Sequence, residues 1–331
     1  MPDTVRFGLT GDVMLGRKVD ERQRHRPPAA VWGDLRERLQ RLDGLLVNLE
    51  CCLSTGGQPW TRTYRPFHFR ADPGWAIPAL EDAGVDCCVL ANNHLLDFGE
   101  SALLDTVDHL DDADIAHTGA GADLDAALEP AVVTVGGVRI AVVSFTDNTP
   151  EYAADESSPG VAYVTIDVDD EQTRNLVSEA LSRARAHDPD VLVTSLHWGP
   201  NMVTEPPAAF EAFGRWLVDR GVDLIHGHSA HVFQALEVYD GAVLCYDTGD
   251  FVDDYAVDPE LRNDRSFLFE TRLDATGTIE ELRLLPTEIS DGAVNQAGGQ
   301  VSGWARNRMR ARSAPYGTEF DREGEELVLS P

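Results

Sequence analysis

The chain has 331 residues, of which 43% are hydrophobic, and 57 acidic residues against 27 basic ones give a formal net charge of -30. This composition is typical of a globular protein with a large core, and the negative charge argues against nucleic-acid binding, which needs a basic surface. Lys18 is the only lysine. An acidic, lysine-poor surface is typical of a protein that works in concentrated salt, where screening removes the self-repulsion of the surface charges.

Apolar strands alternate with amphipathic helical stretches along the first half of the chain. In chain order the pattern predicts a strand at residues 5–10, a helix at 31–41, a strand at 44–49, a helix at 77–83, a strand at 85–90, a helix at 101–113 and a strand at 115–118. Residues 51–70, between the second strand and the second helix, contain paired glycines and two prolines and read as a loop.

The second half mixes such units with hairpins. The pattern predicts strands at 131–135 and 138–145, a helix at 171–186, a strand at 191–196, a helix at 208–220, and strands at 222–225, 232–239, 242–246, 266–273 and 278–285. Turns that contain glycine join three of the strand pairs into hairpins. The combination of βα units and hairpins predicts an α/β fold with two packed sheets covered by helices.

We expect one domain over residues 1–290 and a C-terminal extension over residues 291–331 that is partly weakly ordered, because the apolar periodicity is lost after Pro286. The sequence shows no secretory leader, and no run of about eighteen apolar residues predicts a membrane span. The cysteines lack zinc-type spacing and read as buried reduced thiols, namely Cys51, Cys52, Cys87, Cys88 and Cys245. Reduced thiols favour a cytoplasmic location.

Five predicted strands end directly in residue types that bind metals. These residues are Asp12, Asn48, Glu50, Asn93, His94, His197, His228 and His231. Because the carboxyl ends of strands line the ligand crevice of an open α/β sheet, we expect these side chains to converge. Imidazole, carboxylate and amide groups together suit zinc, manganese or iron. Six to eight such groups are too many for one tetrahedral ion and predict two divalent ions, about 3.5–4 Å apart.

Other interpretations stay open for several polar residues. Asn48 also fits a turn amide, and His226 fits a packed position at a strand end as well as a ligand. Asp147 and Asp250 follow further strands, either as ligands or as hydrogen-bond partners of ligands. Arg17 follows the first strand and is placed to hold an anionic substrate group. The remaining histidines read as surface residues, namely His25, His68, His109, His117 and His187.

Seven ordered motifs carry a family resemblance. They are GDVMLGR at 11–17, NLE at 48–50, FRADP at 69–73, LANNHLLDFGE at 90–100, LHWGPN at 196–201, HGHSAHV at 226–232 and YDTGDFVDDY at 246–255. With these motifs the chain resembles the CapA-type poly-γ-glutamate capsule synthesis proteins, a branch of the calcineurin-like metallophosphatase superfamily. The resemblance implies a four-layer α/β/β/α sandwich of two mixed sheets. It places Asp12, Glu50, Asn93, His94, His197, His228 and His231 at the superfamily's metal ligands.

The sequence departs from the superfamily pattern in three places: one more residue separates His228 and His231, Glu50 stands where many relatives have aspartate, and the first strand differs. The first strand lacks the Asp-x-His motif, because Val13 and Met14 follow Asp12. This departure predicts that one metal position is weaker or empty.

Two functions follow from these observations. The leading hypothesis is a metal-dependent hydrolase that acts on a phosphoester or a γ-glutamyl-type anionic substrate with two ions of Mn, Zn or Fe, and with His94, Asn93 and Arg17 as catalytic residues. The alternative is a non-catalytic, metal-dependent binding subunit of a polyglutamate synthesis machinery, with a ligase as partner. A purely structural role would instead require the histidines to be packed core residues.

Overall fold

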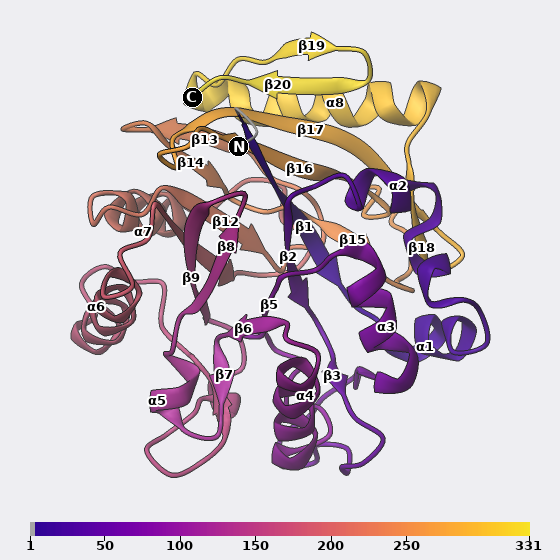
Figure 1. Ribbon diagram of the computed structural model, residues 1–331, viewed down its shortest axis with the longest axis vertical. Coiled ribbons are helices and arrows are strands. Elements are labelled where there is room, and N and C mark those ends of the chain that lie inside the picture. Colours follow the sequence, from indigo (N-terminus) through magenta and orange to yellow (C-terminus); the bar gives the residue numbers. More distant parts are fainter. Residues whose placement is uncertain (1–3) are drawn as a thin grey trace.

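The computed structural model describes residues 4–331, and its largest sheet has ten strands (Figure 1). These strands are β1 (Val5–Val13), β2 (Gly44–Leu49), β5 (Cys87–Val89), β6 (Ala116–Thr118), β15 (Asp250–Val252), β16 (Arg265–Leu273), β17 (Ile279–Ser290), β18 (Ala293–Gln296), β19 (Asp321–Glu323) and β20 (Glu326–Leu329). β1, β2, β5 and β6 pair in parallel, whereas β16 pairs antiparallel to β1. The sheet is therefore mixed, as the sequence predicts.

The second large sheet has six strands. They are β8 (Ala131–Val135), β9 (Val138–Thr146), β11 (Val191–His197), β12 (Leu224–His228), β13 (Leu236–Tyr239) and β14 (Ala242–Cys245). The central strands β9, β11, β12 and β14 are parallel, and β8 and β13 close the edges as antiparallel hairpin partners. Two small ribbons complete the strands, one of β3 (Cys52–Leu53) and β4 (Arg70–Ala71), the other of β7 (Ala120–Gly121) and β10 (Gly160–Val161).

Helices cover the outer faces of both sheets. The α-helices are α1 (Arg17–Gln23), α2 (Arg36–Leu39), α3 (Pro73–Ala83), α4 (Glu100–Asp112), α5 (Leu124–Ala127), α6 (Glu171–Arg185), α7 (Ala208–Val218) and α8 (Gly299–Ser313), and the 3-10 helices are η1 (Pro28–Leu35), η2 (Pro150–Tyr152) and η3 (Ala314–Tyr316). Apolar residues of α3 and α4 share a core with the ten-stranded sheet, and those of α6 and α7 with the six-stranded sheet. The predicted α/β/β/α order of layers is thus confirmed.

The two sheets pack face to face through a third apolar core. Phe7 and Leu9 of β1 and Ile140 and Val142 of β9 all belong to this core. In β2 the side chains of Leu45 and Val47 face the helices and that of Leu46 faces the other sheet, as the alternation of a strand requires. Because both faces are buried, these parallel strands are continuously apolar, and the sequence pattern alone located them.

The predicted helix at 31–41 is wrong in type. Residues 28–35 form the 3-10 helix η1, and only the short α2 follows it. The break lies at Gly33, whose φ of 48° and ψ of -133° are not helical. A Cβ at this position would lie 2.3 Å from the carbonyl oxygen of Val294, so β18 packs closely where only glycine fits.

Residues 291–331 form β18, α8, β19 and β20. Ala305 and Met309 of α8 and Leu327 of β20 belong to the core between the sheets. β20 extends the ten-stranded sheet by pairing with β17, and Figure 1 shows α8 lying along that end of the molecule. The predicted division of the chain at residue 290 stays a prediction.

The five cysteines are free and buried, in agreement with the sequence prediction. Burial raises the pKa of the Cys245 thiol to about 12, so that it stays protonated and packs as a small apolar group. Across residues 4–331, none of the helices combines the length and the apolar character that crossing a bilayer requires.

Candidate metal centre

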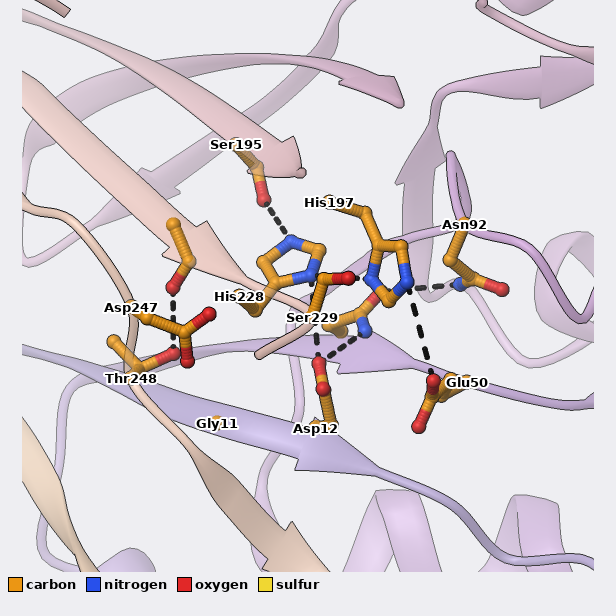
Figure 2. Close-up of polar contacts among 12 residues, drawn as sticks. Gly11, Asp12, Glu50, Asn92, Ser195, His197, His228, Ser229, Asp247 and Thr248 are labelled. Atoms are coloured by element: carbon orange, nitrogen blue, oxygen red, sulfur yellow. Dashed lines mark hydrogen bonds and ion pairs between the residues drawn. The ribbon is translucent and has the colours of Figure 1, made fainter. Parts of the chain in front are cut away.

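Strand ends from both large sheets meet at one place. Asp12 lies near the end of β1 and Glu50 directly follows β2, whereas His197 and His228 end β11 and β12. His197 and His228 are register partners in the parallel pair of β11 and β12. All four side chains are buried, and Figure 2 shows them pointing toward one another across the gap between the sheets. The convergence that the sequence predicts is present.

A first group of potential ligands combines Asp12, His197 and His228. Their ligand atoms all lie within 4.8 Å of one another. The Nδ1 atoms of His197 and His228 are 2.9 Å apart, and Nδ1 of His228 lies 3.4 Å from Oδ1 of Asp12. One carboxylate and two imidazoles at this spacing form a donor set that suits a divalent transition metal.

A second group shares Asp12 with the first. It consists of Asp12, His231 and Asp250, again with ligand atoms within 4.8 Å. Nδ1 of His231 lies 3.4 Å from Oδ2 of Asp12 and 2.8 Å from Oδ1 of Asp250. Asp12 therefore turns one oxygen toward each group.

Asp250 is the member of this set that the sequence prediction left open. It lies in the three-residue strand β15, which pairs in parallel with β1 and places Asp250 beside Asp12. A signal for this pairing exists in the sequence, because the tripeptide Thr-Gly-Asp at 10–12 recurs at 248–250. Gly11 permits the close approach, since a Cβ there would lie 2.0 Å from the carbonyl oxygen of Gly249.

Glu50 lies between the first group and His94. Its Oε1 is 3.9 Å from Nε2 of both His94 and His197, and its Oε2 accepts a hydrogen bond of 3.0 Å from the Tyr255 hydroxyl. His94 follows β5, stacks on Phe69 with 3.8 Å between the ring centroids, and directs Nδ1 to Oδ2 of Asp97 at 2.6 Å. The Nε2 edge of His94 thus faces the centre.

Several buried ligand-type atoms lack hydrogen bonds to any other group in residues 4–331. They are Oδ2 of Asp12, Oε1 of Glu50, Oδ1 of Asn93, Nε2 of His197 and Oδ2 of Asp250. Buried polar atoms without partners are costly and rare in folded proteins. Their concentration around one point, with nitrogen and oxygen donors only, fits bound divalent cations, so the residues present suit the group that the family resemblance implies.

Burial sets the charge states of the centre. It lowers the pKa of His197 to about 3 and that of His228 well below its usual range, so both imidazoles are neutral, which is the form that binds metals. Burial raises the pKa of Glu50 and Asp250 well above the usual range. It also acts to raise the pKa of Asp12, but the close approach of His231, at 3.4 Å, and the other nearby imidazoles outweigh burial and hold that pKa below its usual range.

Two asparagines hold the Asp12 carboxylate and His94 in place. Nδ2 of Asn48 donates to Oδ1 of Asp12 at 2.7 Å, and Nδ2 of Asn92 donates to Oδ1 of Asn48 at 3.1 Å. Oδ1 of Asn92 accepts from the backbone N–H of His94 at 3.0 Å. Asn92, to which the sequence prediction gave no separate role, is therefore the amide that joins the ends of β2 and β5. Asn93 lines the adjoining cavity.

The other open residues take supporting positions. Nε2 of His226 faces the carbonyl oxygen of Thr10 at 2.7 Å, and its Nδ1 faces Oγ of Ser195, away from the ligand groups. Oδ1 of Asp147 accepts from the backbone N–H of Gly199 at 2.9 Å and so holds the loop after β11. Neither residue belongs to the two ligand groups.

A cavity of about 560 Å³ adjoins the centre. Asn93, His94 and His231 line its inner side, and Arg17 and Lys18 line another part of its wall. The Arg17 guanidinium lies 4.9 Å from the centroid of the Phe67 ring, and it pairs with Asp254 at 3.2 Å. The sole lysine of an acidic chain and a neighbouring arginine thus lie beside the predicted ligands.

Comparison with known proteins places these features in a family. The sequence profile of the bacterial capsule synthesis protein PGA_cap matches residues 6–255. A probable polyglutamine synthesis accessory protein of Mycobacterium tuberculosis is 33% identical over 96% of this chain and 93% of its own length. The capsule biosynthesis protein CapA of Bacillus anthracis is 29% identical over 86% of this chain and 67% of its own length.

Two further proteins are similar. The PGA biosynthesis protein CapA of Bacillus subtilis is 28% identical over 76% of this chain and 64% of its own length. The crystal structure of a hypothetical protein from Thermus thermophilus covers 88% of this chain and 96% of its own at 16% identity and a TM-score of 0.45. The extent of the profile match and the 33% identity over nearly the whole chain show that the protein belongs to the PGA_cap family of bacterial capsule synthesis proteins.

Proposed function

We propose that the protein is a metal-dependent hydrolase of the metallophosphatase type, acting on an anionic substrate with a phosphoester or γ-glutamyl-type linkage. The observation that carries the proposal is the pair of ligand groups that share Asp12, next to a cavity into which His94 faces. The names of the related proteins refer to capsule, PGA and polyglutamine synthesis. The resemblance to poly-γ-glutamate capsule synthesis proteins supports an anionic substrate of this kind.

Two divalent ions, of Mn, Zn or Fe, are the proposed cofactors. Asp12, His197 and His228 would hold one ion, and Asp12, His231 and Asp250 the other. Glu50, whose Oε1 lies 3.9 Å from Nε2 of His197, and Asn93, which lines the adjoining cavity, are proposed as further ligands. Ions bound there would supply Lewis acidity and lower the pKa of water. Burial lowers the pKa of His197 and His228, and these neutral imidazoles need not lose a proton before they bind an ion. In the second group, Asp250 and Asp12 raise the pKa of His231 against the effect of burial, so a metal ion would have to displace a proton there.

His94 is the proposed proton donor to the leaving group. Oδ2 of Asp97 lies 2.6 Å from its Nδ1 and also accepts from the backbone N–H of Phe69, so the ring is fixed by a buried carboxylate. An imidazole held in this way presents Nε2 toward the cavity side, where a positioned side chain contributes about 10²–10⁴-fold to a hydrolytic rate. Stacking on Phe69 restricts the ring further.

Arg17 and Lys18 are the proposed contacts for the anionic part of the substrate. In a chain with a net charge of -30, both line the same cavity as His94. A carboxylate or phosphate of the substrate would compete with Asp254 for the Arg17 guanidinium, through charge-assisted hydrogen bonds. The five free thiols support a reducing, cytoplasmic setting for this reaction.

A second candidate function is a non-catalytic binding subunit that presents an anionic polymer to a partner ligase. This function is favoured by Met14, which occupies the position where the superfamily's Asp-x-His motif has a histidine ligand. Sδ of Met14 accepts from the backbone N–H of Gly16 at 3.1 Å and so is engaged locally. One relative is moreover named an accessory protein.

Turnover by the metal-loaded protein decides between the two functions. We expect metal-dependent hydrolysis of a chromogenic phosphoester or γ-glutamyl substrate, and a loss of about 100-fold or more in His94→Ala. His187→Ala, at an exposed histidine outside the centre, is the matched control and keeps the wild-type rate. Metal-dependent binding of polyglutamate without any turnover would contradict the hydrolase and support the binding subunit.

A further inference from the structure

A continuous chain of buried hydrogen bonds leads from the ten-stranded sheet to the metal centre. The carbonyl oxygen of Thr10 in β1 lies 2.7 Å from Nε2 of His226 in β12. Nδ1 of His226 lies 3.0 Å from Oγ of Ser195 in β11, and the same Oγ lies 2.9 Å from Nε2 of His228. All of these side chains are buried.

Elementary chemistry gives this chain a direction. A carbonyl oxygen only accepts, so Nε2 of His226 carries a hydrogen, and the neutral ring then has a bare Nδ1. That Nδ1 accepts from the Ser195 hydroxyl, which has one hydrogen and is therefore the acceptor toward His228. Nε2 of His228 must then carry the hydrogen that it donates to Ser195. No carboxylate is bonded to His226 in the described part of the chain, and burial without a counter-charge favours the neutral ring.

The remaining nitrogen of His228 is Nδ1, which in this tautomer has a lone pair and no hydrogen. This atom lies 3.4 Å from Oδ1 of Asp12 and 2.9 Å from Nδ1 of His197, within the first ligand group. We propose that His226 and Ser195 are positioning residues that fix the tautomer of His228, so that its Nδ1 presents a lone pair to the metal. This proposal rests on the metal centre of the proposed function.

Strand geometry explains why these residues lie where they do. Ser195 pairs with His226, and His197 with His228, in the parallel register of β11 and β12. Residues two apart in a strand face the same side, so the positioning pair lies directly behind the ligand pair. Figure 2 shows the hydroxyl of Ser195 reaching the His228 ring from the side opposite Asp12. The alternation His-x-His in β12 therefore places one ligand and one residue that orients it.

Nitrogen NMR of the metal-free protein tests the tautomer directly. With ¹⁵N-labelled histidine, we expect His226 and His228 of the wild type both to show the pattern of a hydrogen on Nε2. In Ser195→Ala the Nε2 hydrogen of His228 loses its acceptor, and the tautomer with the hydrogen on Nδ1 should become populated. His228 with its hydrogen on Nδ1 in the wild type would overturn the proposal, and this measurement needs no variant that might unfold.

Manganese affinity provides the second readout. We expect Ser195→Ala to bind Mn²⁺ about 10–100-fold more weakly, because residues that orient a metal-binding histidine typically have effects of this size. Ser144→Ala is the matched control: Ser144 is the register partner of Ser195 in β9, is also buried, and its hydroxyl has no partner among the described residues. The control should bind as the wild type does. Equal affinities in both variants, with folding intact, would refute a positioning role.

The two proposals fail in different ways. If neither the wild type nor the variants bind Mn²⁺, Zn²⁺ or Fe²⁺, the proposal of a metal centre is rejected. The NMR pattern of the metal-free wild type still reports whether His226 and Ser195 fix the tautomer. A metal-binding wild type whose His228 carries its hydrogen on Nδ1 would leave the metal centre intact and reject the positioning pair.

Discussion

Buried carboxylates dominate the chemistry of the centre at the scale of single residues. Asp12, Glu50 and Asp250 are fully buried, and one oxygen of each has no hydrogen-bond partner within residues 4–331. Without a cation, such atoms cost about 1–3 kcal/mol each through desolvation. The site is therefore expected to destabilise the metal-free protein, and bound metal should remove that cost.

Replacing Glu50 by Gln tests this cost. We expect Glu50→Gln to stabilise the metal-free protein by about 1–3 kcal/mol at neutral pH, because an amide needs no charge or proton to be buried. The same change should reduce the stabilisation by added Mn²⁺, since it removes the negative charge and one of the two carboxylate oxygens that could bind the ion. Urea unfolding with and without Mn²⁺ measures both effects. A metal-free variant less stable than the wild type would show that Glu50 contributes to folding in some other way.

The acid sensitivity of the metal-free protein should depend on His226. Burial lowers the pKa of His226 to about 4, from 6.5. Between these values the unfolded state binds the proton and the folded state does not, so stability falls as the pH is lowered from about 6.5 to 4, by about 3 kcal/mol at most. Unfolding curves of wild type and His226→Gln should diverge over this range, and parallel pH profiles would contradict the assignment.

At the scale of elements, glycines determine how closely the strand ends approach. A Cβ at Gly11 would lie 2.0 Å from the carbonyl oxygen of Gly249, and one at Gly227 would lie 2.2 Å from that of Tyr246. These contacts are with backbone, which cannot rotate away. The segment between β14 and β15 therefore passes between β1 and β12 at backbone distance, and it brings Asp250 to the centre.

Two glycine-to-alanine substitutions should have opposite signs. Gly11→Ala forces β1 and the Gly249 backbone apart, and we expect a loss of stability of about 1–3 kcal/mol or more. Gly303→Ala, within α8 and with open space around the added methyl group, should raise stability by about 0.5–1 kcal/mol. Thermal unfolding compares the two. Equal effects would mean that the spacing of β1 and Gly249 is not a constraint.

The sequence predicts much of the site, because the rule used is a local one. Asp12, Glu50, His94, His197 and His228 each follow an apolar strand, and parallel strands bring their carboxyl ends together. The role of Asp250 stayed open between ligand and hydrogen-bond partner, because β15 has three residues and depends on pairing with β1, which no local periodicity reveals. The helix α8 was not predicted, because few of its side chains, such as Ala305 and Met309, belong to the core and its apolar periodicity is therefore weak. The break in η1 at Gly33 could not be predicted either, because it depends on the close approach of the β18 backbone at Val294.

At the scale of the whole molecule, charge is the dominant feature. The net charge of -30, with a single lysine, implies strong repulsion between surface carboxylates at low ionic strength. Ion pairs such as that of Arg183 with Asp125 and Glu179 offset only part of it, and exposed pairs are weak. The fold should therefore depend on dissolved salt more than that of a neutral protein does.

A salt titration tests this dependence. We expect the midpoint of urea unfolding to rise steadily with KCl from low ionic strength to about 1 M, where the Debye length is about 3 Å. KCl and NaCl should act alike if screening is the cause. A midpoint that falls, or stays constant, over this range would show that the acidic surface does not limit stability.

The central claim is that the converging strand ends hold metal, and elemental analysis tests it most directly. We would measure the metal content of the purified protein and of His228→Ala, after reconstitution with Mn²⁺, Zn²⁺ or Fe²⁺. The proposed two-ion centre predicts about two equivalents in the wild type and a clear loss in the variant, because His228 belongs to the first ligand group. A wild-type protein that retains none of these metals would contradict the claim.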